Sequence, residues 1–275
     1  MLGKIKTSWS LTKQCWTVLK LDKELLIFPV ISTIAVVVLL IGLIDTDFLV
    51  FPADESGEIN MTQLSAYFVY YFACVFIILF FNTALIACAM IRFRGSDPTI
   101  MMGLGAASSR IGSIFMWSLV SATVGLIIKL FGRSDNFLAR LAASLFGAIW
   151  AVASYFVLPV LIVEGTGPFT AVKRSIAIIR KTWGETLGAE IGMGLIFLVI
   201  GIPSWVLFIA AASFQESSIA AYLFFAGLGW MLIAMVMAAA MDGIMRAALF
   251  NYAHDGKMLN HFGNEFGENA FKSSK

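Results

Sequence analysis

Residues 25–44 decide the fold class, because they read LLIFPVISTIAVVVLLIGLI and contain no charged side chain. A helix of about 20 residues is about 30 Å long, which matches the hydrocarbon core of a bilayer. The stretch is also bounded by charge, with Lys23 and Glu24 before it and Asp45 after it. We therefore interpret residues 25–44 as a membrane-spanning helix.

Five further apolar blocks of comparable length follow along the chain. They cover about 66–93, 111–131, 141–163, 187–214, and a last stretch from about 219 to beyond Met241. The chain as a whole is 60% hydrophobic and only 13% charged, against roughly 25% charged residues in soluble domains. Backbone polar groups in lipid must be satisfied within the segment, so each block is expected to be helical. The sequence predicts an all-α integral membrane bundle of six transmembrane helices.

The basic residues predict the orientation of this bundle. With the N-terminus placed inside, sixteen of the 19 Lys and Arg residues fall on the inner side, as the positive-inside rule requires. The outer loops contain only Lys129, Arg133 and Arg140 as basic residues, all around one turn. We expect both termini to be cytoplasmic, with residues 1–252 forming a single domain and 253–275 a polar cytoplasmic tail.

Two inner segments have the pattern of amphipathic interfacial helices. Residues 3–20 place an apolar stripe (Ile5, Trp9, Thr12, Trp16, Leu19) beside lysines at intervals of seven (Lys6, Lys13, Lys20). Residues 168–185 place Phe169, Val172, Ile176, Ile179 and Trp183 beside a second group of basic side chains. Such helices lie at the membrane surface with their basic side toward headgroups or water. The candidate lipid or partner contacts are Lys6, Lys13, Trp16, Lys173, Arg174, Arg180, Lys181 and Trp183.

The two segments also match each other at a constant offset. The pattern Lys6-x-Ser8-x4-Lys13-x2-Trp16 aligns with Lys173-x-Ser175-x4-Arg180-x2-Trp183, and Ser109 and Trp117 keep the same spacing between serine and tryptophan. We therefore predict three units, 1–93, 97–163 and 167–252, each with an interfacial helix before two spans, that is, before spans 1, 3 and 5. The alternative is that any amphipathic basic helix yields such matches.

Polar residues inside the spans are few. They are Asn82, Glu190, Asp242 and Arg246, and each is a candidate because polar groups are costly in lipid. Asn82 is expected to hydrogen-bond to a neighbouring helix, and the spacing of Asp242 and Arg246 favours a local ion pair. Pro29, Pro159 and Pro203 also fall in spans and are expected to free carbonyls and kink helices, a feature of transporters as well as of ordinary spans.

Small residues recur at intervals of four on the fourth span, at Ala143, Gly147 and Ala151. Gly192 and Gly194 on the fifth span and Ala238–Ala240 with Gly243 on the sixth are further examples. This pattern predicts close helix packing. An open pore would need a polar stripe, and no span has a full polar face.

Known catalytic patterns are missing from the sequence. There is no GxSxG, HExxH, Walker loop or GxGxxG, and the three cysteines form no CxxC. The two histidines, His254 and His261, lie close to the C-terminus. We expect no catalytic residue, cofactor or metal site, no nucleic-acid partner, and a protein that is not an enzyme.

Several of these residues also carry a family resemblance. They are Asp22-Lys23-Glu24-Leu25, Phe28-Pro29, Trp150, Pro159, Glu164, Ala171-Val172-Lys173-Arg174-Ser175 and Trp183-Gly184-Glu185. The chain resembles the domain of unknown function family 6159, and more distantly the membrane domain attached to some glycerophosphodiester phosphodiesterases. The resemblance implies a six-span inner-membrane protein of a prokaryote. It implies no phosphodiesterase activity, because the soluble catalytic domain and its carboxylates and histidines are missing.

Two functions follow as hypotheses. The first is a non-enzymatic membrane module whose basic helices bind lipid headgroups or a partner protein, although the same charges would also serve to fix topology. The alternative is a small transporter or channel, favoured by the repeat pattern and the prolines. The scarcity of ionisable residues in the spans disfavours ion-coupled transport, so its cargo would be hydrophobic.

Overall fold

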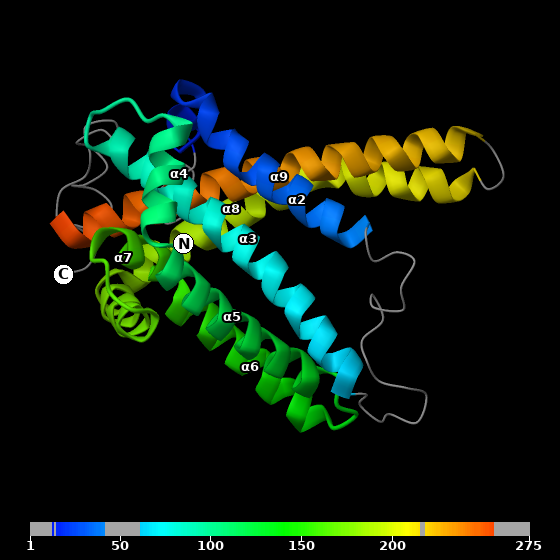
Figure 1. Ribbon diagram of the computed structural model, residues 1–275. Helices are drawn as coiled ribbons and strands as arrows, with labels where there is room; N and C mark the ends of the chain where they lie inside the picture. Colours follow the sequence, from blue (N-terminus) through cyan, green and yellow to red (C-terminus); the bar gives the residue numbers. More distant parts are fainter. Residues whose placement is uncertain (1–12, 14, 42–60, 215–217, 256–275) are drawn as a thin grey trace.

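The computed structural model of the chain describes residues 13, 15–41, 61–214 and 218–255, with only the backbone described for 182–190 and 255. Within these ranges every regular element is a helix (Figure 1). After a helical stretch at 15–21, they are η1 (Lys23–Leu26), α2 (Ile27–Ile41), α3 (Met61–Phe93), α4 (Ile100–Ser109), α5 (Ile111–Gly132), α6 (Phe137–Ser154), α7 (Val157–Val163), α8 (Pro168–Ser213) and α9 (Ser218–Asp255).

Six segments of the described chain are long and apolar enough to cross a membrane. They are Lys23–Ile41, Met61–Phe93, Ile111–Gly132, Phe137–Val163, Ile191–Ser213 and Ser218–His254. Each coincides with one of the predicted blocks to within a few residues at most boundaries, although the sixth extends well past Met241. The prediction of an all-α bundle with six membrane-spanning helices is confirmed.

The segments that precede the odd-numbered spans differ in how they join them. The helix at 15–21 ends before Asp22, and α4 ends at Ser109, so both are separated from the span that follows. In contrast, the predicted helix at 168–185 and the fifth span form one continuous α8 of 46 residues. At 1.5 Å per residue this helix is about 69 Å long, roughly twice the hydrocarbon thickness. Gly184 and Gly188 lie within this helix, and its backbone continues through both.

The prolines divide into two kinds. Pro29 is the third residue of α2 and Pro159 the third of α7, and a proline in the first turn needs no intrahelical hydrogen bond. The expected kinks at these two positions stay a prediction, and the fourth span is interrupted shortly before Pro159, at Tyr155 and Phe156. Pro203, in contrast, lies far from either end of its helix, α8.

The fourth span is interrupted at Tyr155 and Phe156, between α6 and α7. The break leaves the backbone N–H of Phe156 outside the regular pattern. This N–H donates to the buried Ser175 Oγ on α8, at 3.0 Å. A residue of the Lys-Arg-Ser motif thus satisfies the interrupted helix, which is a structural role that the sequence did not reveal.

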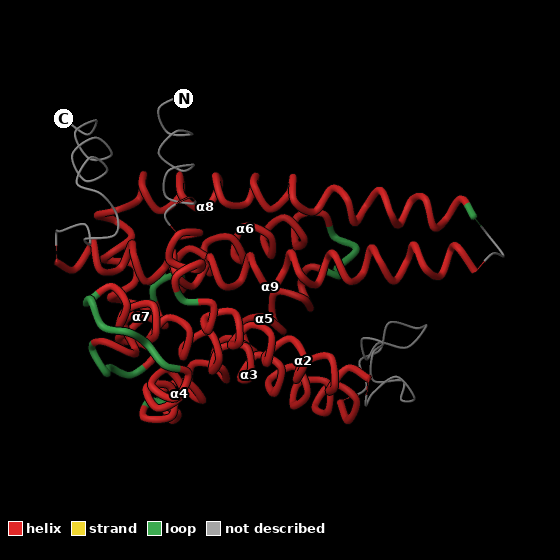
Figure 2. Tube along the Cα trace, turned by 90° about the horizontal axis from the view of Figure 1, so that it is seen from above, coloured by secondary structure: helices red, strands yellow, loops and turns green. Residues whose placement is uncertain are grey.

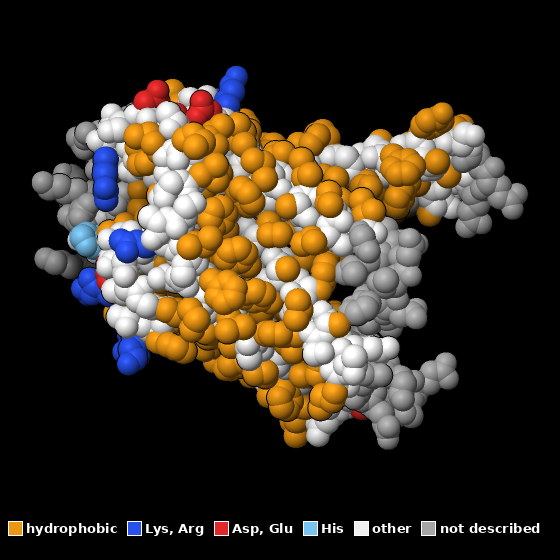
Figure 3. Space-filling model, in the orientation of Figure 1, with side chains coloured by type: hydrophobic (Ala, Val, Ile, Leu, Met, Phe, Trp, Pro, Cys, Tyr) orange, Lys and Arg blue, Asp and Glu red, His pale blue; other side chains and the backbone are white. Residues whose placement is uncertain are grey.

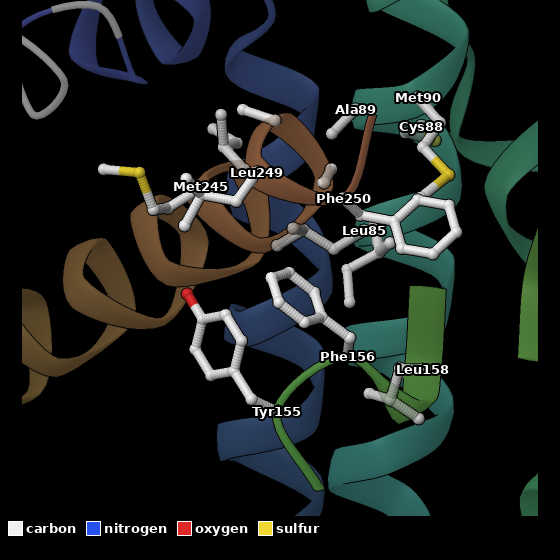
Figure 4. Close-up of a cluster of buried hydrophobic side chains, with 14 of the residues drawn as sticks. Leu85, Cys88, Ala89, Met90, Tyr155, Phe156, Leu158, Met245, Leu249 and Phe250 are labelled. Atoms are coloured by element: carbon white, nitrogen blue, oxygen red, sulfur yellow. The ribbon is translucent and has the colours of Figure 1, made fainter. Parts of the chain in front are cut away.

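One hydrophobic core lies where α3, α7 and α9 converge (Figure 4). Leu85, Phe156, Met245 and Phe250 are almost completely buried in it. The helices approach closely here: a Cβ at Gly103 on α4 would lie 2.8 Å from the Ala84 carbonyl oxygen. At Gly243 on α9, a Cβ would collide with the side chain of Leu85.

Two helical hairpins, α5–α6 and α8–α9, extend away from this core (Figures 1 and 2). The predicted small-residue packing holds for part of them. Ala143 is buried, and a Cβ at Gly147 would be in ordinary contact with Ile128, whereas Ala151 and Gly194 are exposed. Some small residues on α6 therefore pack against α5, and others lie on the exposed surface.

Candidate functional site

Charged side chains gather at the end of the molecule that holds α4, α7 and the C-terminal part of α9 (Figure 3). The surface of the hairpins is mostly hydrophobic in the same view. This charged end contains most of the predicted site residues that the structure describes. We refer to it as the basic end.

The helix at 15–21 packs against the basic end through Cys15, Val18 and Leu19, which are all at most 2% exposed. Lys13 and Lys20 are exposed, and the Lys20 Nζ lies 5.4 Å from the centre of the half-buried Trp16 ring. Burial, together with the nearby charge of Asp242, raises the pKa of the Cys15 thiol, so this cysteine is kept as a packing thiol. The sequence pattern placed Leu19 correctly on the apolar side but missed Cys15 and Val18.

The first turns of α8 also bury some side chains and expose others. Ala171, Ser175, Ile178 and Ile179 are buried, and the predicted basic residues Lys173, Arg174, Arg180 and Lys181 are exposed. Phe169 was expected on the apolar stripe but is 68% exposed. The buried stripe is therefore rotated from the predicted one, because Ser175 turns inward to reach the break before α7.

Ion pairs brace the basic end. Arg92 at the end of α3 donates from Nε to Asp22 at 2.5 Å, and its Nη2 donates to both Asp22 and Asp97. Asp22 is buried, whereas the side chain of Asp97 is 88% exposed. Sequence reasoning did not identify this cluster, although Asp22 opens the Asp-Lys-Glu-Leu motif. The cluster ties the start of the first span to the end of the second.

A second brace joins α7 to α8. Arg174 Nε donates to Glu164 Oε1 at 2.9 Å. Next to Glu164, Gly165 has a φ of +64°, which favours glycine, and a Cβ there would lie 2.7 Å from the Arg110 guanidinium. Glu164 and Arg174, two residues of the family motif, therefore have a structural contact.

Asp242 and Arg246 form the expected ion pair on α9, with 2.8 Å between Asp242 Oδ2 and Arg246 Nε. The Arg246 guanidinium lies 4.7 Å from the centre of the Tyr155 ring, at the break between α6 and α7. Both charged side chains are about 30% exposed. The pair thus links α9 to the interrupted span.

The remaining candidates are spread through the molecule. Asn82 is half-buried on α3, and its hydrogen bond to another helix stays a prediction. Trp183 and Glu190 lie on α8 in the stretch whose side chains are not described, and Lys6 lies outside the described residues. In the described part of the chain, no group of three or more His, Cys, Asp or Glu residues could hold a metal ion.

An apolar groove of about 230 Å³ lies between the N-terminal helix and the α8–α9 hairpin. Its lining consists of Lys13, Trp16, Ile196, Phe197, Ile200, Met237 and Met241. Every lining side chain except Lys13 is apolar or aromatic. We call it the first groove.

A second groove, of about 410 Å³, lies between α6 and the start of α8. Its lining consists of Ala148, Ile149, Val152, Ala153, Ile176, Ile179 and Arg180. Arg180 contributes the basic side chain here. Alanines 148 and 153 form part of the α6 wall, so some of the small residues on this span line open space.

At the other end of the bundle lies Lys129, one of the three basic residues that the predicted orientation places outside. Its Nζ donates to Tyr67 Oη at 2.9 Å and lies 4.6 Å from the centre of the Tyr71 ring. A Cβ at Gly125 would lie 2.5 Å from Tyr71 Oη, so this glycine admits the ring beside the lysine. Lys129 thus has structural contacts between α5 and α3.

Comparison with known proteins gives a family without an activity. The model of a family described as "Family of unknown function (DUF6159)" matches residues 61–260. No curated protein matches the chain.

Proposed function

The chain belongs to the family of unknown function DUF6159, and we propose that it is a non-enzymatic inner-membrane module that binds anionic lipid headgroups. In this proposal both termini are cytoplasmic and the basic end faces the inner leaflet of a prokaryotic membrane. The distribution of exposed Lys and Arg supports that orientation.

The observation that carries the proposal is that some cations of the basic end form ion pairs within the protein and others do not. Arg92, Arg174 and Arg246 form internal ion pairs. Within the described residues, no ion pair includes Lys13 or Arg180, and both are exposed. Cations left over after the internal pairs attract anionic lipid, at about 1 kcal/mol per basic residue near the surface.

Native mass spectrometry tests the proposal. The protein is extracted in a mild detergent with its own membrane lipids, as wild type and as the double variant Lys13→Glu/Arg180→Glu. The expected result is retained anionic lipid in the wild type and its loss in the variant. Retention of the same lipid by a correctly inserted variant would show that these basic faces are ordinary solvated surface.

A small transporter for a hydrophobic cargo is the second candidate. The continuous α8 with Pro203 inside it favours this function, and the Trp230 Nε1–H donates to the Ile200 carbonyl at 2.8 Å beside that proline. A lipid-scrambling assay in vesicles of phosphatidylcholine and phosphatidylglycerol separates the two candidates. Transfer of labelled lipid between leaflets by the wild type, lost in Pro203→Ala, would favour transport over binding alone.

A further inference from the structure

We infer that the two grooves are lipid seats, each of which holds an acyl chain of an anionic glycerophospholipid of the inner leaflet, with its headgroup at Lys13 in the first groove and at Arg180 in the second. This inference deepens the proposed function and rests on it. It adds the location of the lipids, their number and the part of each lipid that the protein contacts.

The two grooves share one feature although they lie between different helices. Each has one cation at a lining position and is otherwise apolar or aromatic. Lys13 and Arg180 are also the residues that align with each other at the offset that relates the N-terminal pattern to the α8 pattern. A shared pattern in sequence thus coincides with a shared arrangement in space.

The packing of each groove follows one rule. The helix that precedes the first span packs beside α8 and α9, and the start of α8 packs beside α6. In each case a segment leading into one pair of spans contacts a different pair. The third segment of this kind is α4, which packs on α3. There Gly103 has no room for a Cβ, so the two helices are too close together to leave a groove at this glycine.

The apolar walls of the first groove run along α8 and α9. Ile196 and Ile200 are one turn apart on α8, as are Met237 and Met241 on α9. They give each wall of the first groove a length of about 6 Å. Trp16, at the same end as Lys13, is a residue type that favours the headgroup region.

The cation, rather than the apolar wall, makes the seat selective. An acyl chain gains no hydrophobic free energy on leaving the bilayer for an apolar groove, because lipid tails are as apolar as the lining. The groove fixes the position of the chain, and the side chain of Lys13 or Arg180 favours a negative headgroup over a zwitterionic one. Asp242 follows the lining residue Met241 on α9, and its charge is paired with Arg246.

Photolabelling in vesicles tests the inference. The probe is a phosphatidylglycerol with a diazirine in one acyl chain, diluted into phosphatidylcholine, and labelled peptides are identified by mass spectrometry. In the wild type, labels are expected at 148–153 and 176–180 for the second groove and at 196–200 and 237–241 for the first. Arg180→Gln should lower labelling of the second groove by about fivefold, the worth of one basic residue near the surface, and leave the first unchanged. Lys13→Gln should do the reverse.

Matched controls distinguish lipid bound in a groove from anionic lipid that is attracted to the basic end as a whole. Arg94→Gln removes the same charge from an exposed position just after α3, outside both groove linings, and should change neither site. Ala148→Trp fills the second groove and should abolish its labelling. Ala142→Trp adds the same side chain at an exposed position of α6 that does not line the groove, and should have no effect. Ala153→Phe provides a second filling variant if Ala148→Trp does not fold.

The possible failures are distinguishable. Labels spread evenly over the outer hairpins, with headgroup binding in native mass spectrometry still dependent on Lys13 and Arg180, would overturn the seats and leave the proposed function standing. If neither groove labelling nor headgroup binding depended on Lys13 and Arg180, both the lipid seats and the proposed function would be overturned. Equal labelling of the grooves by a phosphatidylcholine probe would refute the selectivity for an anionic headgroup.

Discussion

The basic end and the outer part of the α8–α9 hairpin are made of the same kind of helix but are stabilised in different ways. In the most apolar stretch of each span, the share of buried residues is 44% for α3, 11% for Ile191–Ser213 and 11% for α9. The basic end also has ion pairs and close glycine contacts, whereas the outer hairpin exposes large side chains such as Trp205, Ile209 and Phe225. In the hairpin, the apolar side chains are suited to contact with lipid, and few of them are packed in a protein core.

The largest effect is expected from Asp22→Ala at the basic end. The change removes the buried carboxylate that accepts two hydrogen bonds from Arg92 and leaves a partly buried cation with only the exposed Asp97. Breaking one side of a buried pair costs about 3 kcal/mol or more. Denaturant unfolding in detergent micelles should show this loss of unfolding free energy. Asp97→Ala, at the exposed partner, should cost well under about 1 kcal/mol; equal losses for the two variants would contradict the ranking.

Ile244→Ala measures the packing of the same end. Ile244 is completely buried in the core between α9 and its neighbours, so the truncation leaves a cavity. Such truncations cost about 2–5 kcal/mol in well-packed interiors. The loss should appear in the same unfolding assay. A loss below about 1 kcal/mol would mean that the basic end is no better packed than the hairpin.

Ser175→Ala tests the link between α8 and the interrupted span. The backbone N–H of Phe156 would lose its acceptor in a buried site, and an unsatisfied buried donor costs about 1–3 kcal/mol. Hydrogen exchange of the Phe156 amide should also accelerate relative to neighbouring core amides. Ser213→Ala is the matched control, since its hydroxyl donates to the Ile209 carbonyl on an exposed part of α8. The interpretation fails if the two variants behave alike.

Trp230→Phe is expected to have a small effect, because it acts in the sparsely packed hairpin. It removes the hydrogen bond from the indole N–H to the Ile200 carbonyl beside Pro203 but keeps an aromatic ring in place. Hydrogen bonds between helices in membranes average about 0.6 kcal/mol. Unfolding of the variant should therefore shift by about that amount, and a shift above about 2 kcal/mol would give this bond a larger part in holding the hairpin.

The sequence was sufficient for the spans because their signal is strong and local. A block without charges, such as residues 25–44, can be recognised without knowing its neighbours. The continuity of α8 was not predicted, because the composition changes between residues 168–185 and the fifth span. The change suggested two elements, whereas the helical backbone runs through both stretches. The first-turn positions of Pro29 and Pro159 depend on where a helix begins, which periodicity locates poorly.

The site was predicted in part for the same reason. The sequence singled out Lys13, Arg180 and the pair Asp242–Arg246 because charges in or near spans stand out. The ion pair is confirmed, and the lipid contacts stay a prediction. The Arg92–Asp22–Asp97 cluster was missed because it joins residues 70 positions apart, and the Ser175 contact because it depends on a break in a different helix. The grooves were missed because they are formed by side chains from two or three elements, and no pattern within one element indicates an open space between them.

The smallest effect is expected from Ile209→Ala on α8, and it is the direct counterpart of Ile244→Ala. Ile209 is 67% exposed on the hairpin, so its side chain faces lipid in the folded state and again when helices separate within the membrane. No transfer from water is involved, and the change leaves no cavity, because lipid fills the space. The unfolding free energy should change by less than about 0.5 kcal/mol. A loss comparable to that of Ile244→Ala would mean that Ile209 is covered by protein in the membrane, and the outer hairpin would then have to be regarded as a contact surface for another chain.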